Sequence, residues 1–289
     1  MEWLKGLFGK GNAQKPTSSA IPKKIPIPDD ELSAFKQWYV EQRKPALALV
    51  PDPSLPIDTF SSRLFGPAFI PDGEEWPVGA DGRTLNFLAQ LNLADCHTLA
   101  NYPRSGIVQF FIGRDDLLGA NFDDLLAGNY LIRYFRPDAP GALQEPPHSG
   151  ERDPSGIDDY SPANNFEFRK RGVILVAEPF EDIIDLSVKE AAQRFDAIPR
   201  EYDLDALYEI VEADEQQRLM HHNTGGFPAF TQTDIRFDER YAPYDHVLLR
   251  LTSDDFSMWG DVGECVFMMR STDLAEGNFS EVVYSWDCS

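Results

Sequence analysis

Residues 225–237 read GGFPAFTQTDIRF, and residues 65–77 read FGPAFIPDGEEWP. Both stretches contain Pro-Ala-Phe, once at 67–69 and again at 228–230. Leu88 and Leu249 have the same separation in the sequence as Pro67 and Pro228, and each leucine lies in an apolar run with the length of a strand. The chain therefore repeats one phrase and continues in a similar way after each copy.

A second set of matches follows at a slightly shorter spacing. Identical residues stand at Gly106 and Gly263, Phe110 and Phe267, Asp116–Leu117 and Asp273–Leu274, and Asn121–Phe122 and Asn278–Phe279. The change in spacing falls in a connection between two predicted strands, where insertions are well tolerated. These matches predict an internal duplication, with repeat one at about 60–125 and repeat two at about 223–289.

The duplication predicts an α+β fold in which two internally repeated, mainly antiparallel β halves with helices share one core. We expect a pseudo-twofold axis between the halves, because a repeat of this length is not the unit of a solenoid. An insert at about 126–222 separates the repeats, and the whole domain covers 29–289. Residues 1–28 are predicted to form a basic N-terminal tail and linker.

Hydrophobic periodicity predicts the strands. Residues 85–93 alternate a continuous apolar face with a mainly polar one, which is typical of a half-buried strand. Short apolar runs predict further strands at 107–112, 130–135, 173–177, 246–252 and 265–270. Residues 137–165 are rich in Pro and Gly and predict a long loop, which is either functional or mobile.

Three segments have helical spacing. The first begins at Asp29 or Asp30, either of which can cap it. A capping box at 187–190 begins the second, and the third runs at about 203–220. The predicted buried faces carry Leu32, Phe35 and Tyr39 in the first helix, Val188, Ala191, Ala192 and Phe195 in the second, and Leu204, Leu207, Tyr208 and Val211 in the third.

The charge of the chain limits the choice of partners. Lys and Arg number 26 against 48 Asp and Glu, for a net charge of −22. The segment 1–28 holds five Lys and one Glu, or +4, which leaves −26 on the remainder. Such a body repels nucleic acid and anionic membranes and attracts basic proteins. The alternative interpretation of this charge is that it provides solubility alone.

The absence of a membrane span, of a signal peptide and of paired cysteines predicts the compartment of the protein and the redox state of its thiols. No apolar run is long enough to form a membrane-spanning helix, so we expect no stable membrane insertion. The first residues lack the apolar core of a signal peptide, and a cytoplasmic location is the expectation. Cys96, Cys265 and Cys288 are far apart, which is typical of reduced, structural thiols.

Motifs for known chemistry are absent from the sequence. It contains no nucleotide-binding glycine loop, no GxSxG, no HExxH and no EF-hand loop. We therefore predict no cofactor and no catalytic residues. His221 and His222 are adjacent, and on a helix they point about 100° apart, so capping of a helix end is favoured over metal binding.

A pocket or interface is predicted at seven residues. Gln232, Asp234 and Arg236 alternate on an extended stretch, where they either line a polar pocket or form a structural network. Acidic residues also crowd 254–264, where a solvated face is favoured over a metal site. The seven candidates are Gln90, Gly225, Gly226, Gln232, Asp234, Trp259 and Asp261.

Several phrases together resemble the YwqG-like family of bacterial proteins of uncharacterised function. They are GPAFIPDGEEWP (66–77), LNFLAQLNL (85–93), GIVQFF (106–111), HHNTGGFPAFTQTDIR (221–236), HVLLRL (246–251), WGDVGECVFMM (259–269) and DLAEGNFSEVVYSWDC (273–288). The match departs at Phe65-Gly66, which replaces a double glycine. The resemblance implies an α+β fold without established enzymatic activity. Members encoded beside secreted antibacterial toxins resemble immunity proteins.

Two functions follow from these observations. The first is a non-catalytic, acidic protein-binding module, most concretely an immunity protein that neutralises a cognate, basic toxin domain. The alternative is a small-ligand-binding protein or an enzyme with a pocket between the two repeats, because seams between related halves are frequent ligand sites.

Overall fold

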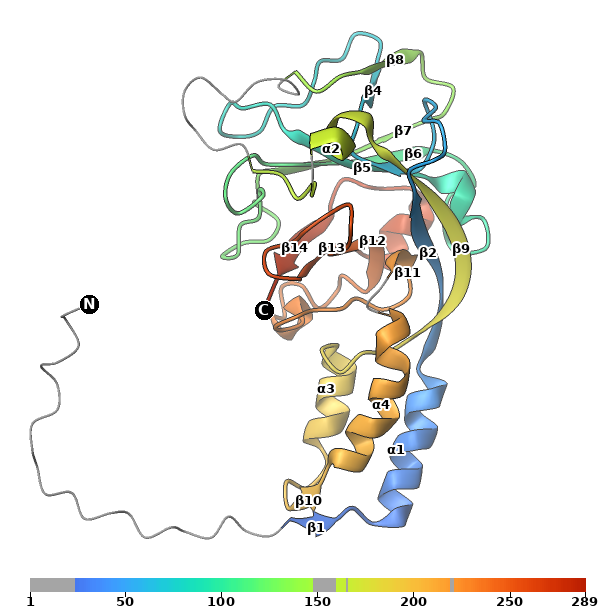
Figure 1. The fold of residues 1–289 in the computed structure, drawn as a ribbon, viewed down its shortest axis with the longest axis vertical. Coiled ribbons are helices and arrows are strands. Elements are labelled where there is room, and N and C mark those ends of the chain that lie inside the picture. Colours follow the sequence, from blue (N-terminus) through green and yellow to red (C-terminus); the bar gives the residue numbers. More distant parts are fainter. Residues whose placement is uncertain (1–23, 148–159, 165, 219–220) are drawn as a thin grey trace, which may run out of the picture.

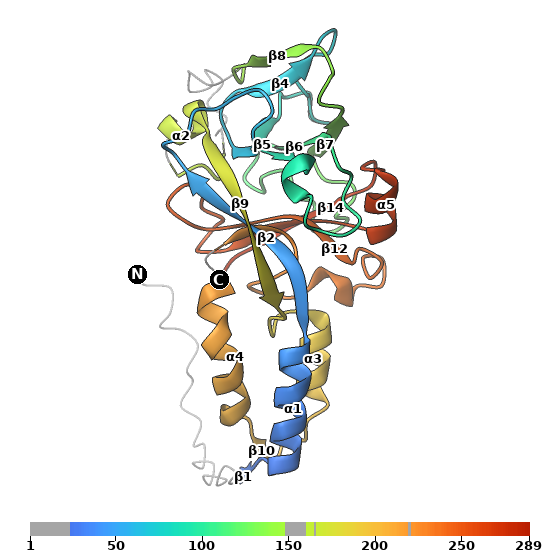
Figure 2. The same ribbon diagram turned by 90° about the vertical axis from the view of Figure 1, so that its right-hand side faces the viewer.

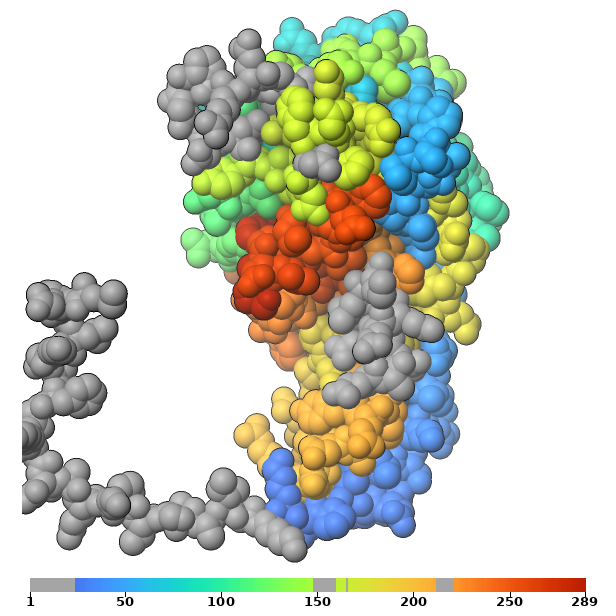
Figure 3. All heavy atoms as spheres, in the orientation of Figure 1, coloured from blue at the N-terminus to red at the C-terminus, as the bar shows by residue number. Residues whose placement is uncertain are grey.

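The computed structural model describes residues 24–147, 160–164, 166–218 and 221–289, and the side chains of 212–218 are not among the described atoms. The body is widest at a large β-sheet and tapers to a helical end (Figures 1 and 3). The predicted tail at 1–23 lies outside the described residues. Ile25–Pro26 form β1, a short strand that pairs with β10 (Tyr202–Asp203) beside the helices.

One antiparallel sheet of ten strands dominates the fold. Its order is β14-β13-β12-β11-β2-β9-β3-β5-β6-β7. The strands are β2 (Arg43–Asp52), β3 (Arg63–Leu64), β5 (Asn86–Asn92), β6 (Ile107–Ile112), β7 (Tyr130–Phe135), β9 (Val173–Ile183), β11 (His222–Gly225), β12 (His246–Thr252), β13 (Glu264–Met269) and β14 (Val283–Asp287). The mainly antiparallel β architecture with helices is therefore confirmed.

The long β2–β9 pair forms the spine of the sheet and runs from the helical end to the upper strands (Figure 2). The sheet curves until its two ends face each other across the core. The rings of Phe110 and Phe267 lie 4.9 Å apart, and the Tyr130 hydroxyl donates to the carbonyl of Val282 at 2.6 Å. Side chains from both ends thus fill one apolar core.

The strand at 86–92 is buried on both faces, so the prediction of a half-buried strand is wrong. The polar side chains on the face predicted to be solvated form hydrogen bonds with loops that cover it. Asn86 donates to the carbonyl of Tyr160 at 2.8 Å, and Gln90 donates to those of Thr59 and Ser61. A small second sheet of β4 (Ala68–Pro71) and β8 (Gly141–Gln144) lies above this region, and β8 falls inside the predicted loop 137–165 (Figure 1).

Three helices pack around a second apolar core at the narrow end. They are α1 (Asp29–Glu41), α3 (Lys189–Asp196) and α4 (Asp205–Arg218), close to the predicted segments. Phe35 and Tyr39 are buried as predicted, but Tyr208 is 45% exposed. Short helices complete the described chain: α2 (Phe166–Arg171), α5 (Ser271–Glu276), η1 (Leu93–Cys96) and η2 (Ile235–Phe237).

Both predicted helix caps are wrong. Pro28 occupies the N-cap of α1, and neither aspartate provides a cap. Ser187 accepts a hydrogen bond from the Phe230 N–H instead of capping α3. The first N–H of α3, at Lys189, donates to the Asp234 carboxylate at 2.8 Å, so a residue 45 positions away satisfies it.

The strand order is symmetric about the β2–β9 pair, with β3-β5-β6-β7 on one side and β11-β12-β13-β14 on the other. Each side has one bulge, between Phe87 and Ala89 in β5 and between Val247 and Leu249 in β12. Ala89 pairs with Phe110, and Leu249 pairs with Phe267. The register therefore aligns Ala89, rather than Leu88, with Leu249. Common ancestry of the two halves stays a prediction.

Candidate functional site

The seven predicted site residues do not gather at one place. Gln90 is buried and accepts a hydrogen bond from Gln109 at 3.0 Å, so its oxygen is bonded within the sheet and its nitrogen to the covering loop at 59–61. Trp259 is fully buried in the main core. Asp261 is exposed in the turn before β13, where its carbonyl accepts from the Ser289 hydroxyl. None of the three lines a described pocket.

Gly225 and Gly226 adopt a backbone conformation that glycine favours, with φ of 72° at both. A Cβ at Gly226 would lie 2.5 Å from the Asp182 carboxylate, which accepts the Phe227 N–H at 2.7 Å. These glycines let the chain leave β11 against β2 and β9. The geometry explains them as structural residues.

Asp234 and Arg236 form a structural network with each other rather than two polar groups that face a pocket. Asp234 is completely buried, and Arg236 binds both its carboxylate oxygens and those of Glu190. Burial lowers the pKa of Arg236, but Asp234 and Glu190 outweigh it and hold the pKa above its usual value. The network fixes the 234–237 turn against the start of α3.

The expected capping of a helix end is wrong for His222, which lies in β11. Its Nδ1 accepts the Thr252 N–H at 3.1 Å, and its Nε2 lies 3.2 Å from Asp254. Burial raises the pKa of Asp254, but His222 and backbone N–H donors overcome this and lower it. No three metal-binding side chains come together within the described residues.

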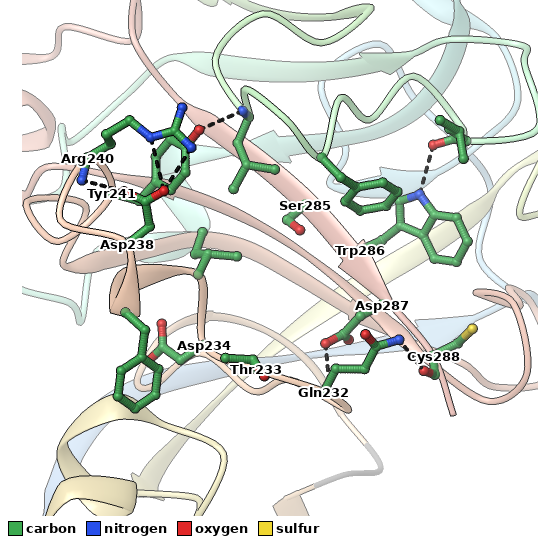
Figure 4. Close-up of a pocket in the computed structure, with 15 residues that line it drawn as sticks. Gln232, Thr233, Asp234, Asp238, Arg240, Tyr241, Ser285, Trp286, Asp287 and Cys288 are labelled. Atoms are coloured by element: carbon green, nitrogen blue, oxygen red, sulfur yellow. Dashed lines mark hydrogen bonds and ion pairs between the residues drawn. The ribbon is translucent and has the colours of Figure 1, made fainter.

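A groove opens where three distant stretches meet beside β14. Residues from 117–125, 232–241 and 285–288 line it, and its cavity volume is about 520 Å³ (Figure 4). We call it the β14 groove. Gln232 lines it and donates to the Cys288 carbonyl at 2.9 Å, and Asp234 lines it from below the network. Two of the seven predicted residues thus share a site.

Apolar side chains stand exposed at this groove. Leu117, Phe122 and Phe237 are 44%, 51% and 43% exposed. The Trp286 ring meets Phe122 edge to face at 6.0 Å, and its N–H donates to the Leu117 carbonyl at 2.8 Å. This bond fixes one aromatic face toward the opening.

Three of the residues that line the groove are carboxylates, Asp234, Asp238 and Asp287, and one, Arg240, is a cation. The 113–126 loop carries Asp115, Asp116, Asp123 and Asp124, and the facing stretch carries Asp238 and Glu239. Asp287 accepts the N–H groups of Thr231 and Gln232, and burial raises its pKa. Arg240 is bound to Asp238 at 2.8 Å and Lys189 lies 3.7 Å from Glu239, but the carboxylates still outnumber these cations. The rim therefore has an excess of negative charge.

Leu117 and Phe122 are two of the residues that the sequence repeats in its second half. Their counterparts, Leu274 and Phe279, are 0% and 6% exposed. The same residue types therefore pack into the core on one side and face solvent on the other. Sequence reasoning noticed these positions as repeats but missed them as site residues, because only the three-dimensional packing distinguishes the copies.

Comparison with known proteins places the chain in a family. The model of a domain of unknown function, DUF1963, matches residues 62–288. The chain belongs to the DUF1963 family. No curated protein matches the chain.

The DUF1963 match begins just before β3 and ends just after β14. It therefore contains both four-strand groups and every stretch that lines the β14 groove, whereas α1 and β2 precede it. None of the helices in the described part of the chain is long and apolar enough to cross a membrane.

Proposed function

We propose that this DUF1963 protein is a non-catalytic binding module whose β14 groove receives a basic, apolar segment of a protein partner. The observation that carries the proposal is the exposure of Leu117 and Phe122, whose counterparts in the other half are buried. Large apolar side chains grouped in a groove are typical of interaction sites.

The charge around the groove determines the class of partner. Aromatic and aliphatic side chains supply contact area at the centre of an interface, and charges at its rim steer the encounter. An acidic rim on a body of this charge favours lysine and arginine on the partner. It disfavours nucleic acid and a second copy of the same chain.

Replacing Phe122 by alanine tests this proposal. We expect binding of a hexapeptide that alternates lysine and phenylalanine to weaken by about 2 kcal/mol, or roughly thirtyfold in Kd. Phe122 is half exposed, so the free energy of unfolding should change by about 1 kcal/mol or less. Titration calorimetry measures the first quantity, and urea unfolding measures the second.

The matched control is Val78→Ala, because Val78 is 57% exposed and lies outside the groove. It should bind the peptide as the unchanged protein does. A hexapeptide with glutamate in place of lysine should not bind. Equal losses in Phe122→Ala and Val78→Ala, or no binding by the unchanged protein, would contradict the proposal.

A finer form of the proposal names the partner. We propose an immunity protein that neutralises a basic domain of a secreted antibacterial toxin; the acidic charge and the resemblance to YwqG-like proteins support it. Titration of a toxin domain encoded by the neighbouring gene, in place of the peptide, tests it. That domain should bind through Phe122 and lose its toxicity on binding, and failure of either would reject this form.

The volume of the groove also favours a second candidate, a small-ligand site between the two halves. At about 520 Å³ it falls within the usual size of ligand pockets, and residues of both predicted repeats line it. An apolar ligand with a cationic group fits this lining. A metabolite screen by thermal shift, repeated on Phe122→Ala, distinguishes this candidate from peptide binding.

We also propose that the two four-strand groups descend from one duplicated unit. One pair of neighbouring residues has an arginine and an amide side chain in each group, but on opposite strands. Arg63 of β3 pairs with Gln90 of β5, whereas Asn223 of β11 pairs with Arg250 of β12. Consecutive residues with positive φ follow both short strands, at 65–66 and at 225–226. Sequence profiles of the two halves across the family should align in this register, and failure to align would reject the duplication.

A further inference from the structure

β14 ends the ten-stranded sheet, so only one of its edges has a neighbouring strand among the described residues. In an antiparallel pair, the backbone groups of successive residues point alternately toward the partner strand and away from it. Which residues of β14 point outward follows from the hydrogen bonds of the next strands.

The register fixes this alternation. The Ser253 N–H donates to the Gly263 carbonyl across β12 and β13, so Cys265 and Phe267 also face β12. Glu264 and Val266 consequently face β14, where their partners are Asp287 and Ser285. The backbone N–H and carbonyl groups of Tyr284 and Trp286 therefore point away from β13. Those of Val282 and Cys288, just beyond the ends of the strand, point the same way.

Two hydrogen bonds agree with this assignment. The Val282 carbonyl accepts from the hydroxyl of Tyr130 in β7, and the Cys288 carbonyl accepts from the Gln232 side chain, so both are bonded to groups other than those of β13. Between them lies Trp286, whose backbone N–H and carbonyl have no hydrogen-bond partner within the described part of the chain. A short length of strand edge is therefore open.

The β14 groove runs along this open edge. Ser285, Trp286, Asp287 and Cys288 are consecutive and all line it (Figure 4). Because successive side chains of a strand point to opposite faces, a hollow that touches all four follows the edge rather than one face. Asp234, Asp238 and Tyr241 lie to one side of the strand in Figure 4.

We infer that an extended, basic segment of a protein partner adds to β14 as an eleventh strand and exchanges two backbone hydrogen bonds with Trp286. The inference rests on the proposed function and specifies how the partner binds. Strand addition of this kind takes affinity from main-chain hydrogen bonds and specificity from alternate side chains.

The surroundings of the edge specify the pattern of the segment. Residues paired across two strands place their side chains on the same face. The residue opposite Trp286 therefore meets Trp286 and Phe122 and is apolar. Its two neighbours lie on the face of Asp287 and Ser285 and are lysine or arginine. Like charge disfavours a second copy of this chain as the added strand.

Amide hydrogen exchange of the full chain, followed by NMR, tests the inference with the lysine–phenylalanine hexapeptide. At saturation, we expect exchange at the Trp286 amide to slow by tenfold or more. The amides of Ser285 and Asp287, which face β13, should be protected in the free protein and change little. If the peptide binds and Phe122→Ala weakens it, but Trp286 exchange is unchanged, strand addition is wrong and the proposed function stands.

Two N-methylated peptides provide the matched control. Alternate amides of a strand point to opposite edges. Methylating the peptide amides that face β14 should reduce affinity tenfold or more, and methylating those that face away from β14 should have little effect. Equal effects of the two sets would overturn the inference. If no peptide binds the unchanged protein, both the proposed function and this inference fail.

Discussion

Replacing Glu264 by leucine should lower the free energy of unfolding by about 3 kcal/mol, because it removes the carboxylate that contributes most to stabilising the buried charge of Arg250. Arg250 and Glu264 are 1% and 5% exposed, and the Arg250 Nε donates to Glu264. Asn223 accepts from the same guanidinium at 3.1 Å, and the negative charges of Asp182 and Asp185 stabilise it less strongly than Glu264 does. Urea unfolding, read by tryptophan fluorescence, measures the loss.

The double variant Arg250→Met with Glu264→Leu identifies the cause. Removing both charges should recover part of the loss, since apolar residues can replace a buried ion pair at little cost, whereas Asp182 and Asp185 then lose a nearby cation. Glu31→Gln is the control for a partly exposed pair, with Arg194 at 3.0 Å, and should cost less than about 1 kcal/mol. If the single and double variants are equally unstable, packing rather than charge explains the effect.

The burial of Glu264 could not be predicted from the sequence. The cluster at 254–264 predicted a solvated acidic face, which holds for Asp255 and Asp261 but not for Glu264. Its partner Arg250 lies on the adjacent strand, on the same face as Val266, which packs against Phe230 and Tyr241, so the burial of both depends on that covering segment of the chain. Periodicity finds strands such as 107–112, 130–135 and 246–252 because that information is local.

The groove could be predicted only in part. Gln232 and Asp234 were found from their alternation, but the site needs Phe122, from a loop far earlier in the sequence, and Trp286, near the end of the described chain. Leu117 and Leu274 have the same residue type and the same preceding aspartate. Only the packing around each decides which one is exposed.

Gly226→Ala should also be strongly destabilising, by about 3 kcal/mol, through backbone strain and a lost hydrogen bond together. An alanine at a φ of 72° costs about 1 kcal/mol. The added Cβ would lie 2.5 Å from the Asp182 carboxylate and must displace it. That carboxylate is 2% exposed and accepts the Phe227 N–H, and leaving a buried N–H without its acceptor costs a further amount of about 1–3 kcal/mol.

The matched control is Gly82→Ala, because Gly82 has a φ of 78° and no atom within 4 Å of the added Cβ. It should lose only the conformational part, about 1 kcal/mol. A double-mutant cycle with Asp182→Ser separates the carboxylate's share, since the shorter side chain removes the 2.5 Å contact and leaves the Cβ atoms of residues 182 and 46 at 3.0 and 3.1 Å. In that background Gly226→Ala should cost less than it does in the unchanged protein. Equal costs of Gly226→Ala with and without Asp182 would show that backbone strain alone, and not the displaced carboxylate, requires glycine here.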